Sequence, residues 1–263
     1  MSYAEIEYKV RDTSWAMSEL QSHPYYELYL LTDGSRELFC ENKMFNVSAG
    51  MLSVIAPFAM HKTTGGSYKR INVYVSPDLL TERERALLER LSEGVALALG
   101  TEAYRHISEL LTYGSDIRIV DHNEKTALKL AFIKAMMYIL ETDAPTSIAS
   151  DASVPSETKD GHMLRIVSYV NEHYRDKLSL EIIGKRFFIS KNSLSARFKK
   201  AMHCSVMEYV AFVRLSKAKE LLSTTNKSIE RIAELCGYSS SNYFSLTFKR
   251  LVGMSPKNYR KNI

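Results

Sequence analysis

The sequence predicts an α+β multidomain chain: an N-terminal β-barrel with trailing helices, then a C-terminal all-α domain with two helix-turn-helix units. Three observations predict it. Short β-branched and aromatic runs separated by glycine turns fill residues 1–76, helical periodicity begins at Thr81, and one helix-turn-helix pattern occurs twice in about the last hundred residues. The length of 263 residues suits about two domains of ordinary size.

Five short runs in the N-terminal region predict strands, at residues 27–32, 37–40, 44–47, 51–55 and 70–75. The turns predicted between them are Asp33-Gly34, Glu41-Asn42-Lys43, Ala49-Gly50 and Gly65-Gly66. Even spacing with glycine turns favours a small barrel or a jelly roll.

The region after the strands predicts helices. Thr81 and Glu84 form a capping box, Gly100 interrupts the helical pattern, and a further amphipathic helix covers residues 124–141. Two interpretations of the apolar stripes stay open: they pack against the barrel, or they form a self-complementary face that makes a homodimer.

A composition change marks the domain boundary. Residues 143–161, DAPTSIASDASVPSETKDG, hold two prolines and four serines with almost no large apolar side chain, which predicts a solvated linker. The predicted domains are therefore 1–142 and 162–263, with residues 143–161 as the linker.

The second helix-turn-helix pattern lies between Ser228 and Arg260. Ser228 is an N-cap for a short helix that ends at Gly237, and a second helix covers residues 240–252. Its predicted apolar stripe is Tyr243, Phe244, Thr247, Phe248 and Leu251, and its opposite face carries Ser241, Asn242, Ser245, Lys249 and Arg250. In a helix-turn-helix motif the second helix enters the major groove of DNA.

The same pattern occurs earlier, shifted by fifty positions. This shift aligns Ile182 with Ile232, Ser190 with Ser240, Phe198 with Phe248 and Tyr209 with Tyr259. A repeat in core and polar positions indicates two copies of one supersecondary unit. A helical pattern over residues 206–222 joins the copies.

These residues resemble the DNA-binding domain of AraC/XylS-type bacterial transcription regulators. The second copy carries I-x-x-I-A-x-x-x-G-Y, then S-x-x-Y-F-S-x-x-F-K-R, then G-x-S-P-x-x-Y-R. The resemblance implies a cytoplasmic regulator that binds double-stranded DNA and contacts RNA polymerase. The chain departs from the family pattern at Leu246, where a basic residue is common, at Gly184, where alanine is usual, and at Phe188 and His203, where smaller turn residues are frequent.

The resemblance also implies which residues face DNA. The base-contact candidates are Asn192, Ser195, Ala196, Ser241, Asn242 and Ser245, and the phosphate-contact candidates are Lys191, Lys199, Lys200, Lys249 and Arg250. Asparagine pairs bidentately with adenine, whereas serine discriminates less between bases. Helix capping is the alternative role for Ser241, although Ser240 fits the cap better.

The N-terminal region resembles the cupin-type effector domain of the same family. The matching features are His23-Pro24-Tyr25-Tyr26-Glu27, Gly34, Ala49-Gly50, Pro57 and His61. Enzymatic cupins hold a cation with a His-x-His pair, a glutamate and a distant histidine. Here Tyr25 occupies one histidine position, so His23, Glu27 and His61 form an incomplete set, and we expect no metal, no cofactor and no enzyme activity.

A barrel mouth suits a small effector. Tyr25, Tyr29, Phe39 and Tyr74 would line it if strand alternation points them inward, and filling the core is the alternative role of each. Two other functions stay open: a metal-dependent cupin enzyme carrying a DNA-targeting module, and a DNA-binding protein that needs no ligand.

Charge is distributed unevenly along the chain. Residues 162–263 hold 19 lysines and arginines against 7 acidic residues, whereas residues 1–161 hold 16 against 23. Clusters at Arg197, Lys199, Lys200 and at Lys249, Arg250 favour nucleic-acid binding over simple solvation of helices. The three cysteines lack the spacing of a zinc or disulfide framework and predict buried, reduced thiols, and the absence of an apolar run of eighteen residues predicts no membrane partner.

Overall fold

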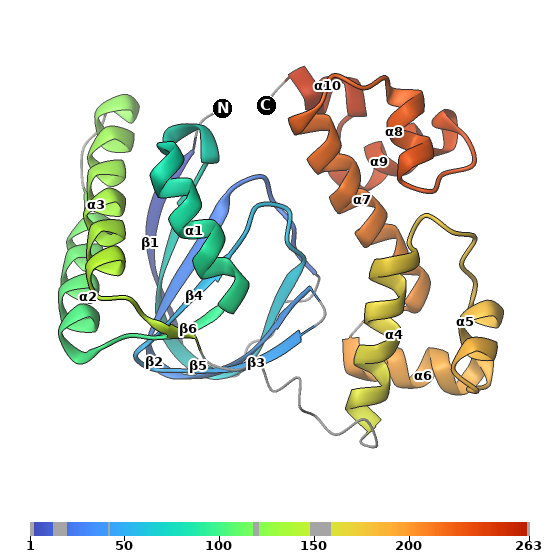
Figure 1. Cartoon of the computed structure of the whole chain (residues 1–263), viewed down its shortest axis with the longest axis horizontal. Helices are drawn as coiled ribbons and strands as arrows, with labels where there is room; N and C mark the ends of the chain where they lie inside the picture. Colours follow the sequence, from blue (N-terminus) through green and yellow to red (C-terminus); the bar gives the residue numbers. More distant parts are fainter. Residues whose placement is uncertain are drawn as a thin grey trace. The chain divides into compact units, whose positions relative to one another are not determined.

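The computed structural model describes residues 3–12, 20–41, 43–117, 121–147, 159–202 and 204–261. The chain divides into two compact units (Figure 1). The first, here called the sheet unit, covers residues 2–17 and 25–152, and the second, the helical unit, covers residues 153–263 with residue 1 and residues 18–24. Residues 148–158 of the predicted linker lie outside the described residues.

The sheet unit is built on an antiparallel sheet with the order β1-β5-β2-β4-β6-β7, in which β3 pairs with β2. The strands are β1 (Ala4–Arg11), β2 (Tyr26–Cys40), β3 (Lys43–Ser48), β4 (Met51–Ile55), β5 (His61–Val75), β6 (Ala96–Ala98) and β7 (Thr146–Ser147). Among the described residues the ladder does not close on itself. The predicted antiparallel domain is confirmed, but its sheet is open and does not form a closed barrel.

Two of the predicted turns lie inside long strands. The register of β2 against β5 shifts on either side of Asp33-Gly34, and Gly65-Gly66 lies within β5. Gly34 has a φ of 88°, and a Cβ there would collide with the carbonyl oxygen of Ser67. The prediction of separate strands was therefore wrong at these points, because a glycine that favours a turn equally serves a β-bulge that bends one continuous strand.

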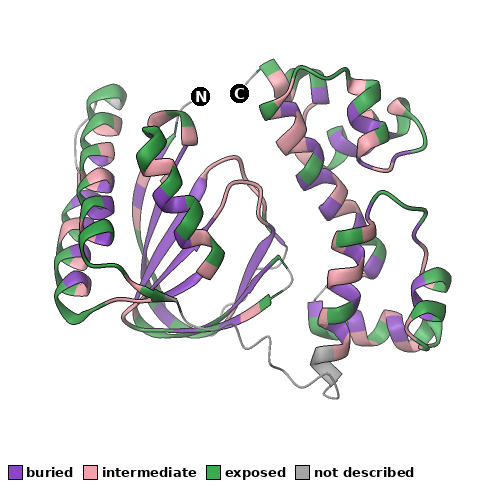
Figure 2. Cartoon of the chain, in the orientation of Figure 1, coloured by how far each residue is buried: buried purple, intermediate pink, exposed green. Residues whose placement is uncertain are grey.

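Away from the bends at residues 33–35 and 65–67, most residues on both faces of β2 and β5 are buried (Figure 2). On the outer face, Leu28 and Ile71 belong to a core that also includes apolar residues of the three helices that follow β5. On the inner face, Tyr29, Leu38 and Tyr68 belong to a second core. Because successive side chains of a strand point to opposite faces, this alternation decides which residues are available to a ligand inside the sheet.

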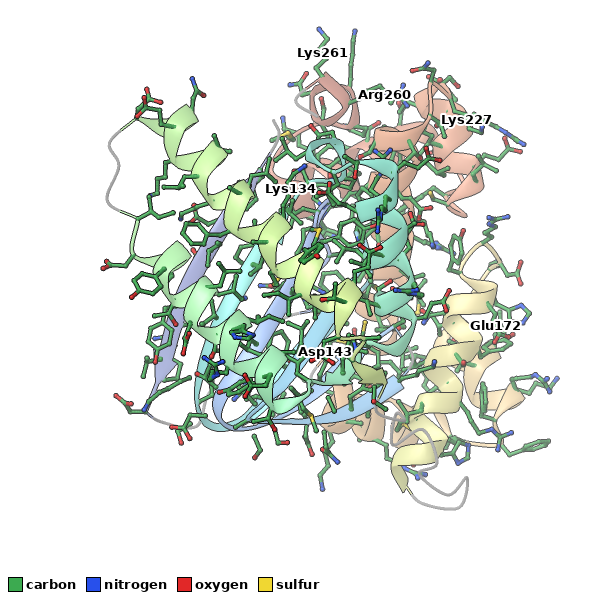
Figure 3. The ribbon with its side chains drawn as sticks, turned by 60° about the vertical axis from the view of Figure 1, so that its left-hand side comes forward. Lys134, Asp143, Glu172, Lys227, Arg260 and Lys261 are labelled. Atoms are coloured by element: carbon green, nitrogen blue, oxygen red, sulfur yellow. The ribbon has the colours of Figure 1, made fainter. Side chains whose placement is uncertain are left out.

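The helices of the sheet unit follow the sequence prediction. They are η1 (Pro77–Leu79), α1 (Glu82–Gly94), α2 (Thr101–Ser115) and α3 (His122–Thr142). The capping box is confirmed, because Thr81 accepts a hydrogen bond from the Glu84 amide and donates its own amide to the Glu84 carboxylate. Lys134 of α3, labelled in Figure 3, pairs with the same carboxylate at 3.2 Å and so ties α3 to α1.

The helical unit contains α4 (Lys159–His173), α5 (Leu180–Arg186), α6 (Lys191–Met202), α7 (Val206–Thr224), α8 (Ile229–Leu235), α9 (Ser241–Val252) and α10 (Pro256–Lys261). The pairs α5–α6 and α8–α9 are the two predicted helix-turn-helix units, and α7 joins them. Within the part of the chain that the structure describes, no helix is long and apolar enough to cross a membrane.

The repeat is offset differently in its two helices. Ser179 caps α5 as Ser228 caps α8, which is an offset of 49, whereas α6 and α9 begin 50 residues apart. The predicted alignment of Ile182 with Ile232 was therefore wrong by one residue: Ile183 is buried like Ile232, and Ile182 is 42% exposed. The turn between α5 and α6 is one residue shorter than the turn between α8 and α9. An alignment that shifts the whole unit by fifty positions cannot reveal this difference.

Candidate nucleic-acid interface and ligand site

Each of α6 and α9, here called the recognition helices, begins on a serine. The Ser190 hydroxyl accepts a hydrogen bond from the Ser193 amide at 3.3 Å, and the Ser240 hydroxyl accepts one from the Tyr243 amide at 3.2 Å. Ser241 is therefore not the cap. The remaining amides of a helix N-terminus attract phosphate oxygens through their N–H groups and the helix dipole.

One side of each recognition helix is buried and the other is open. Leu194, Phe198 and Met202 bury one side of α6, and Phe244, Thr247 and Phe248 bury one side of α9. The predicted base-contact residues lie off these core faces: Asn192, Ala196 and Asn242 are exposed, and Ser195, Ser241 and Ser245 are half-buried. Each helix thus presents its small polar side chains toward solvent.

Exposed cations gather at the ends of the recognition helices. Lys199 and Lys200 end α6, and Lys249 and Arg250 end α9. Lys191, at the start of α6, pairs with Glu181 at 2.6 Å across an exposed surface. An exposed pair of this kind contributes little stability, so a phosphate can replace the carboxylate at small cost.

The open side of α9 is more apolar than the sequence predicted. Tyr243 is 59% exposed and Leu251 40% exposed, so neither belongs to the buried stripe. Leu246, the residue after the base-contact candidate Ser245, is 70% exposed. The prediction missed Leu246 as a residue of the open surface, although the family commonly has a basic side chain at this position.

The turn of the second unit is anchored to the segment after α4. Arg214 of α7 donates to the carbonyl oxygens of Tyr174 at 2.8 Å and Asp176 at 2.9 Å. A Cβ at Gly237 would lie 2.7 Å from the backbone of Arg175, so only glycine fits there. These contacts fix the second helix-turn-helix unit on the first part of the helical unit.

Arg260 closes the other end of the second unit. Its guanidinium donates to the carbonyl oxygen of Lys227, between α7 and α8, at 2.7 Å; Figure 3 labels both residues. The neighbouring Tyr259 ring packs against Phe248, with ring centroids 5.4 Å apart. The final Tyr-Arg of the motif therefore holds α10 against α9.

Three of the four predicted effector residues share the inner side of the sheet unit. The rings of Tyr25 and Tyr74 meet edge to face at 5.6 Å. Tyr29 lies two positions from Glu27 along β2 and is fully buried. Phe39 lies between Leu38 and Cys40, which both belong to the inner core, so its side chain points to the opposite face.

A polar cluster adjoins the tyrosines. Asn72 donates from Nδ2 to Glu27 Oε1 and to the Tyr74 hydroxyl, both at 2.8 Å. His61 Nε2 lies 3.1 Å from Glu27 Oε2, and His61 Nδ1 lies 3.0 Å from the Ala59 carbonyl oxygen. Burial and the Glu27 charge raise the pKa of Tyr74 above its ordinary value.

Two members of the incomplete metal set lie in the sheet unit, where His61 Nε2 is 3.1 Å from Glu27 Oε2, whereas His23 belongs to the helical unit. Imidazole and carboxylate are donors that Zn²⁺ accepts, and His61 Nε2 faces the Glu27 carboxylate while Nδ1 faces a carbonyl oxygen. The fourth protein ligand of enzymatic cupins has no counterpart at Tyr25.

The geometry of the helical unit defines a class: a DNA-binding protein with two helix-turn-helix units on one connecting helix. A model of a helix-turn-helix domain matches residues 183–262, and a model of an AraC-like ligand binding domain matches residues 4–111. The two models together match well over half of the chain. The chain belongs to the AraC family of transcription regulators and carries an N-terminal ligand-binding domain.

Relatives span nearly the whole chain. A probable transcriptional regulator, LumQ of Photobacterium leiognathi, is 25% identical over 90% of this chain and 90% of its own. The transcriptional activator RhaS of Escherichia fergusonii is 23% identical over 91% of this chain and 86% of its own. The solved structure of ToxT from Vibrio cholerae matches 98% of this chain and 97% of its own at 15% identity, with a TM-score of 0.39.

Proposed function

We propose that α6 and α9 read two successive major-groove segments of an operator. The base-reading residues are Asn192, Ser195, Ala196, Ser241, Asn242 and Ser245, and the phosphate-binding residues are Lys191, Lys199, Lys200, Lys249 and Arg250. One observation carries the proposal: both recognition helices bury one side and present small polar residues, then cations, on the other. Short polar groups reach base edges while flanking cations neutralise phosphates.

The proposed role of the sheet unit is to regulate transcription in response to a ligand. We propose that a small molecule binds on its inner face beside Tyr25, Tyr29 and Tyr74, and that this binding changes transcription through contact with RNA polymerase. The tyrosines and the polar cluster around Asn72 support this site, because pockets for small molecules combine apolar walls with a few placed polar groups. The relative RhaS is named an activator, which favours activation here.

The regulator acts as a homodimer in this proposal. Tyr113 of α2 is 76% exposed, and Tyr138 of α3 is 68% exposed. Exposed aromatic side chains on neighbouring helices favour an interface with a second copy. Sedimentation at several protein concentrations tests this, with Tyr138→Glu expected to shift the protein toward monomer.

A binding-site selection with the full chain tests the DNA-binding proposal. We expect a consensus with two blocks about one helical turn apart and a specificity ratio of at least ~10³ over a scrambled duplex. Asn242→Ala should relax base preference at one position by about 1–3 kcal/mol. Asn123→Ala, at an exposed position in the first turn of α3, is the control. Equal affinity for selected and scrambled duplexes would reduce the proposal to electrostatic attraction.

A further inference from the structure

The inner face of the sheet unit contains a buried arginine, Arg70, that has no counter-charge among the described residues. Arg70 of β5 is 6% exposed, and no described residue hydrogen-bonds its Nε atom. Among the described residues, no carboxylate lies within ion-pair distance of Arg70. Buried cations in proteins are ordinarily paired, because removing a charge from water costs several kcal/mol without a partner.

A second arginine increases the positive charge at this place. Arg36 is 2% exposed and donates from Nη1 to the Gly66 carbonyl oxygen at 2.9 Å. Burial lowers the pKa of Arg36, and the charge of Arg70 lowers it further, while Tyr68 acts in the opposite direction. The two guanidinium groups are therefore close enough to repel each other.

Aromatic rings contact the two guanidinium groups without accepting hydrogen bonds from the arginine N–H groups. The Arg70 Cζ atom lies 5.3 Å from the ring centroid of Tyr29 and 5.1 Å from that of Tyr68, and the Arg36 Cζ atom lies 4.7 Å from the Tyr68 centroid. A ring interacts with the cation through its π face, whereas guanidinium N–H groups point outward in their own plane. This arrangement orients a donor fork that matches a planar oxyanion.

A row of buried polar groups crosses the sheet next to Arg70. Tyr29 of β2 pairs in register with Ser53 of β4 and with Asn72 of β5, and all three residues are fully buried. Within the part of the chain that the structure describes, the Tyr29 hydroxyl, the Ser53 hydroxyl and Asn72 Oδ1 make no hydrogen bond of acceptable geometry. Folded proteins rarely leave such atoms unsatisfied, so the row indicates a bound group.

Two neighbouring groups do not alter this conclusion. Glu27 on the same face is engaged by Asn72 and His61, at 2.8 and 3.1 Å, and forms no ion pair with Arg70. Burial raises the pKa of Tyr29 to about 12, although the nearby Ser53 hydroxyl and Arg70 act to lower it. Tyr29 therefore stays a neutral donor at physiological pH.

We propose that the effector of this regulator is a small organic acid. Its carboxylate binds the donor fork of Arg70, its hydroxyl or carbonyl group faces Tyr29, Ser53 and Asn72, and its body packs on the apolar inner core that includes Leu31 and Ile55. The inference rests on the proposed function, because it names the ligand class of the same unit.

Thermal unfolding of the full chain tests the proposal with matched probes. Gluconate, benzoate and inorganic phosphate are compared at equal ionic strength with glucitol and benzyl alcohol. At least one carboxylate should raise the Tm of the wild type by about 2–4 °C or more, and its neutral partner should not. A response to phosphate alone would assign the site to phosphate esters and overturn the carboxylate assignment.

Two variants complete the test. In Arg70→Met the carboxylate effect should disappear, and the ligand-free Tm should equal or exceed that of the wild type, because the substitution removes an uncompensated buried charge. Arg83→Met, which breaks an exposed pair with Glu141, is the control and should keep the carboxylate effect.

The proposal is overturned if no carboxylate stabilises more than its neutral partner, if Arg70→Met responds like the wild type, or if Arg70→Met lowers the ligand-free Tm. Operator binding is measured in parallel on all three proteins without probes. If the wild type shows no sequence-specific binding, the proposed function is contradicted. If it binds its operator but no carboxylate stabilises it, only this inference is removed.

Discussion

The guanidinium of Arg214 lies over the ring of Tyr238, with Cζ 5.6 Å from the ring centroid. Arg214 comes from the helix that joins the two helix-turn-helix units, and Tyr238 comes from the turn of the second unit. The same side chain donates to two carbonyl oxygens that follow α4. One half-buried residue thus connects three parts of the helical unit.

Arg214→Met should destabilise the helical unit. The substitution keeps the apolar stem but removes two hydrogen bonds from a charged donor, each worth about 1.5–3 kcal/mol, and the contact with Tyr238. We expect a loss of at least ~2 kcal/mol in urea unfolding. Arg231→Met, which removes an exposed pair with Glu234, is the matched control, and an equal loss in both variants would contradict the assigned role.

Phe188→Gly should stabilise the protein. Phe188 is 97% exposed and has a φ of 56°, at the place where the second unit has Gly237 with a φ of 76°. A side chain in this conformation costs about 1–2 kcal/mol, and the exposed ring offers little packing in return. We expect a gain of about 0.5–1 kcal/mol in the free energy of unfolding, after the extra chain entropy of glycine.

The reciprocal substitution is the control for that experiment. Gly237→Ala should destabilise the protein, since its Cβ would meet the backbone of Arg175. If both substitutions change stability in the same direction, the equivalence of the two turns is wrong.

Leu246→Arg should strengthen DNA binding without changing base preference. The side chain is 70% exposed on the open side of α9, so an added cation can reach a phosphate. One more phosphate contact should steepen the dependence of log K on log salt by about 0.9. Titrations at four salt concentrations on selected and scrambled duplexes measure this, and Leu128→Arg on α3 controls for net charge.

Stability should fall in mild alkali because of Cys236. Burial raises the pKa of its thiol from an ordinary value of 9.0 to about 12, although Arg175 and Arg214 act to lower it. A raised pKa of an acid means that the stabilising contribution is complete below pH 9 and is lost as the pH rises from about 9 to about 12.

Between pH 8 and pH 10, the wild type should therefore lose on the order of 1 kcal/mol more than Cys236→Ala. Cys204→Ala, which removes a half-exposed thiol, is the control and should behave like the wild type. Identical pH dependence in all three proteins would show that the Cys236 thiol has an ordinary pKa.

Local signals predicted the helical unit well, because each of its helices is specified by nearby residues. Ser179, Ser228 and Ser240 each cap a helix of this unit from within one turn of the chain. The exposure of Tyr243 could not be read in the same way. Its aromatic side chain fits the periodicity, but a helix of this length buries only the positions that the facing helices can cover.

The sheet unit was less predictable because its order depends on distant pairing. β1 was missed, since its mixture of charged and apolar residues becomes a strand only beside β5, where the paired residues lie 57 to 71 positions later in the chain. Arg36 and Arg70 appeared as ordinary charges in the sequence. Only the register of β2 against β5 and the burial of both faces reveal that these charges lie inside.

The anchoring of the second turn by Arg214 and Gly237 has a consequence for the promoter. If α6 and α9 read two operator halves as proposed above, their fixed separation requires a fixed helical phase between those halves. Inserting one base pair between the halves would rotate the second half by roughly 35° about the duplex axis, since about 10.5 base pairs make a turn. Base substitutions in that spacer should therefore be tolerated far better than insertions or deletions.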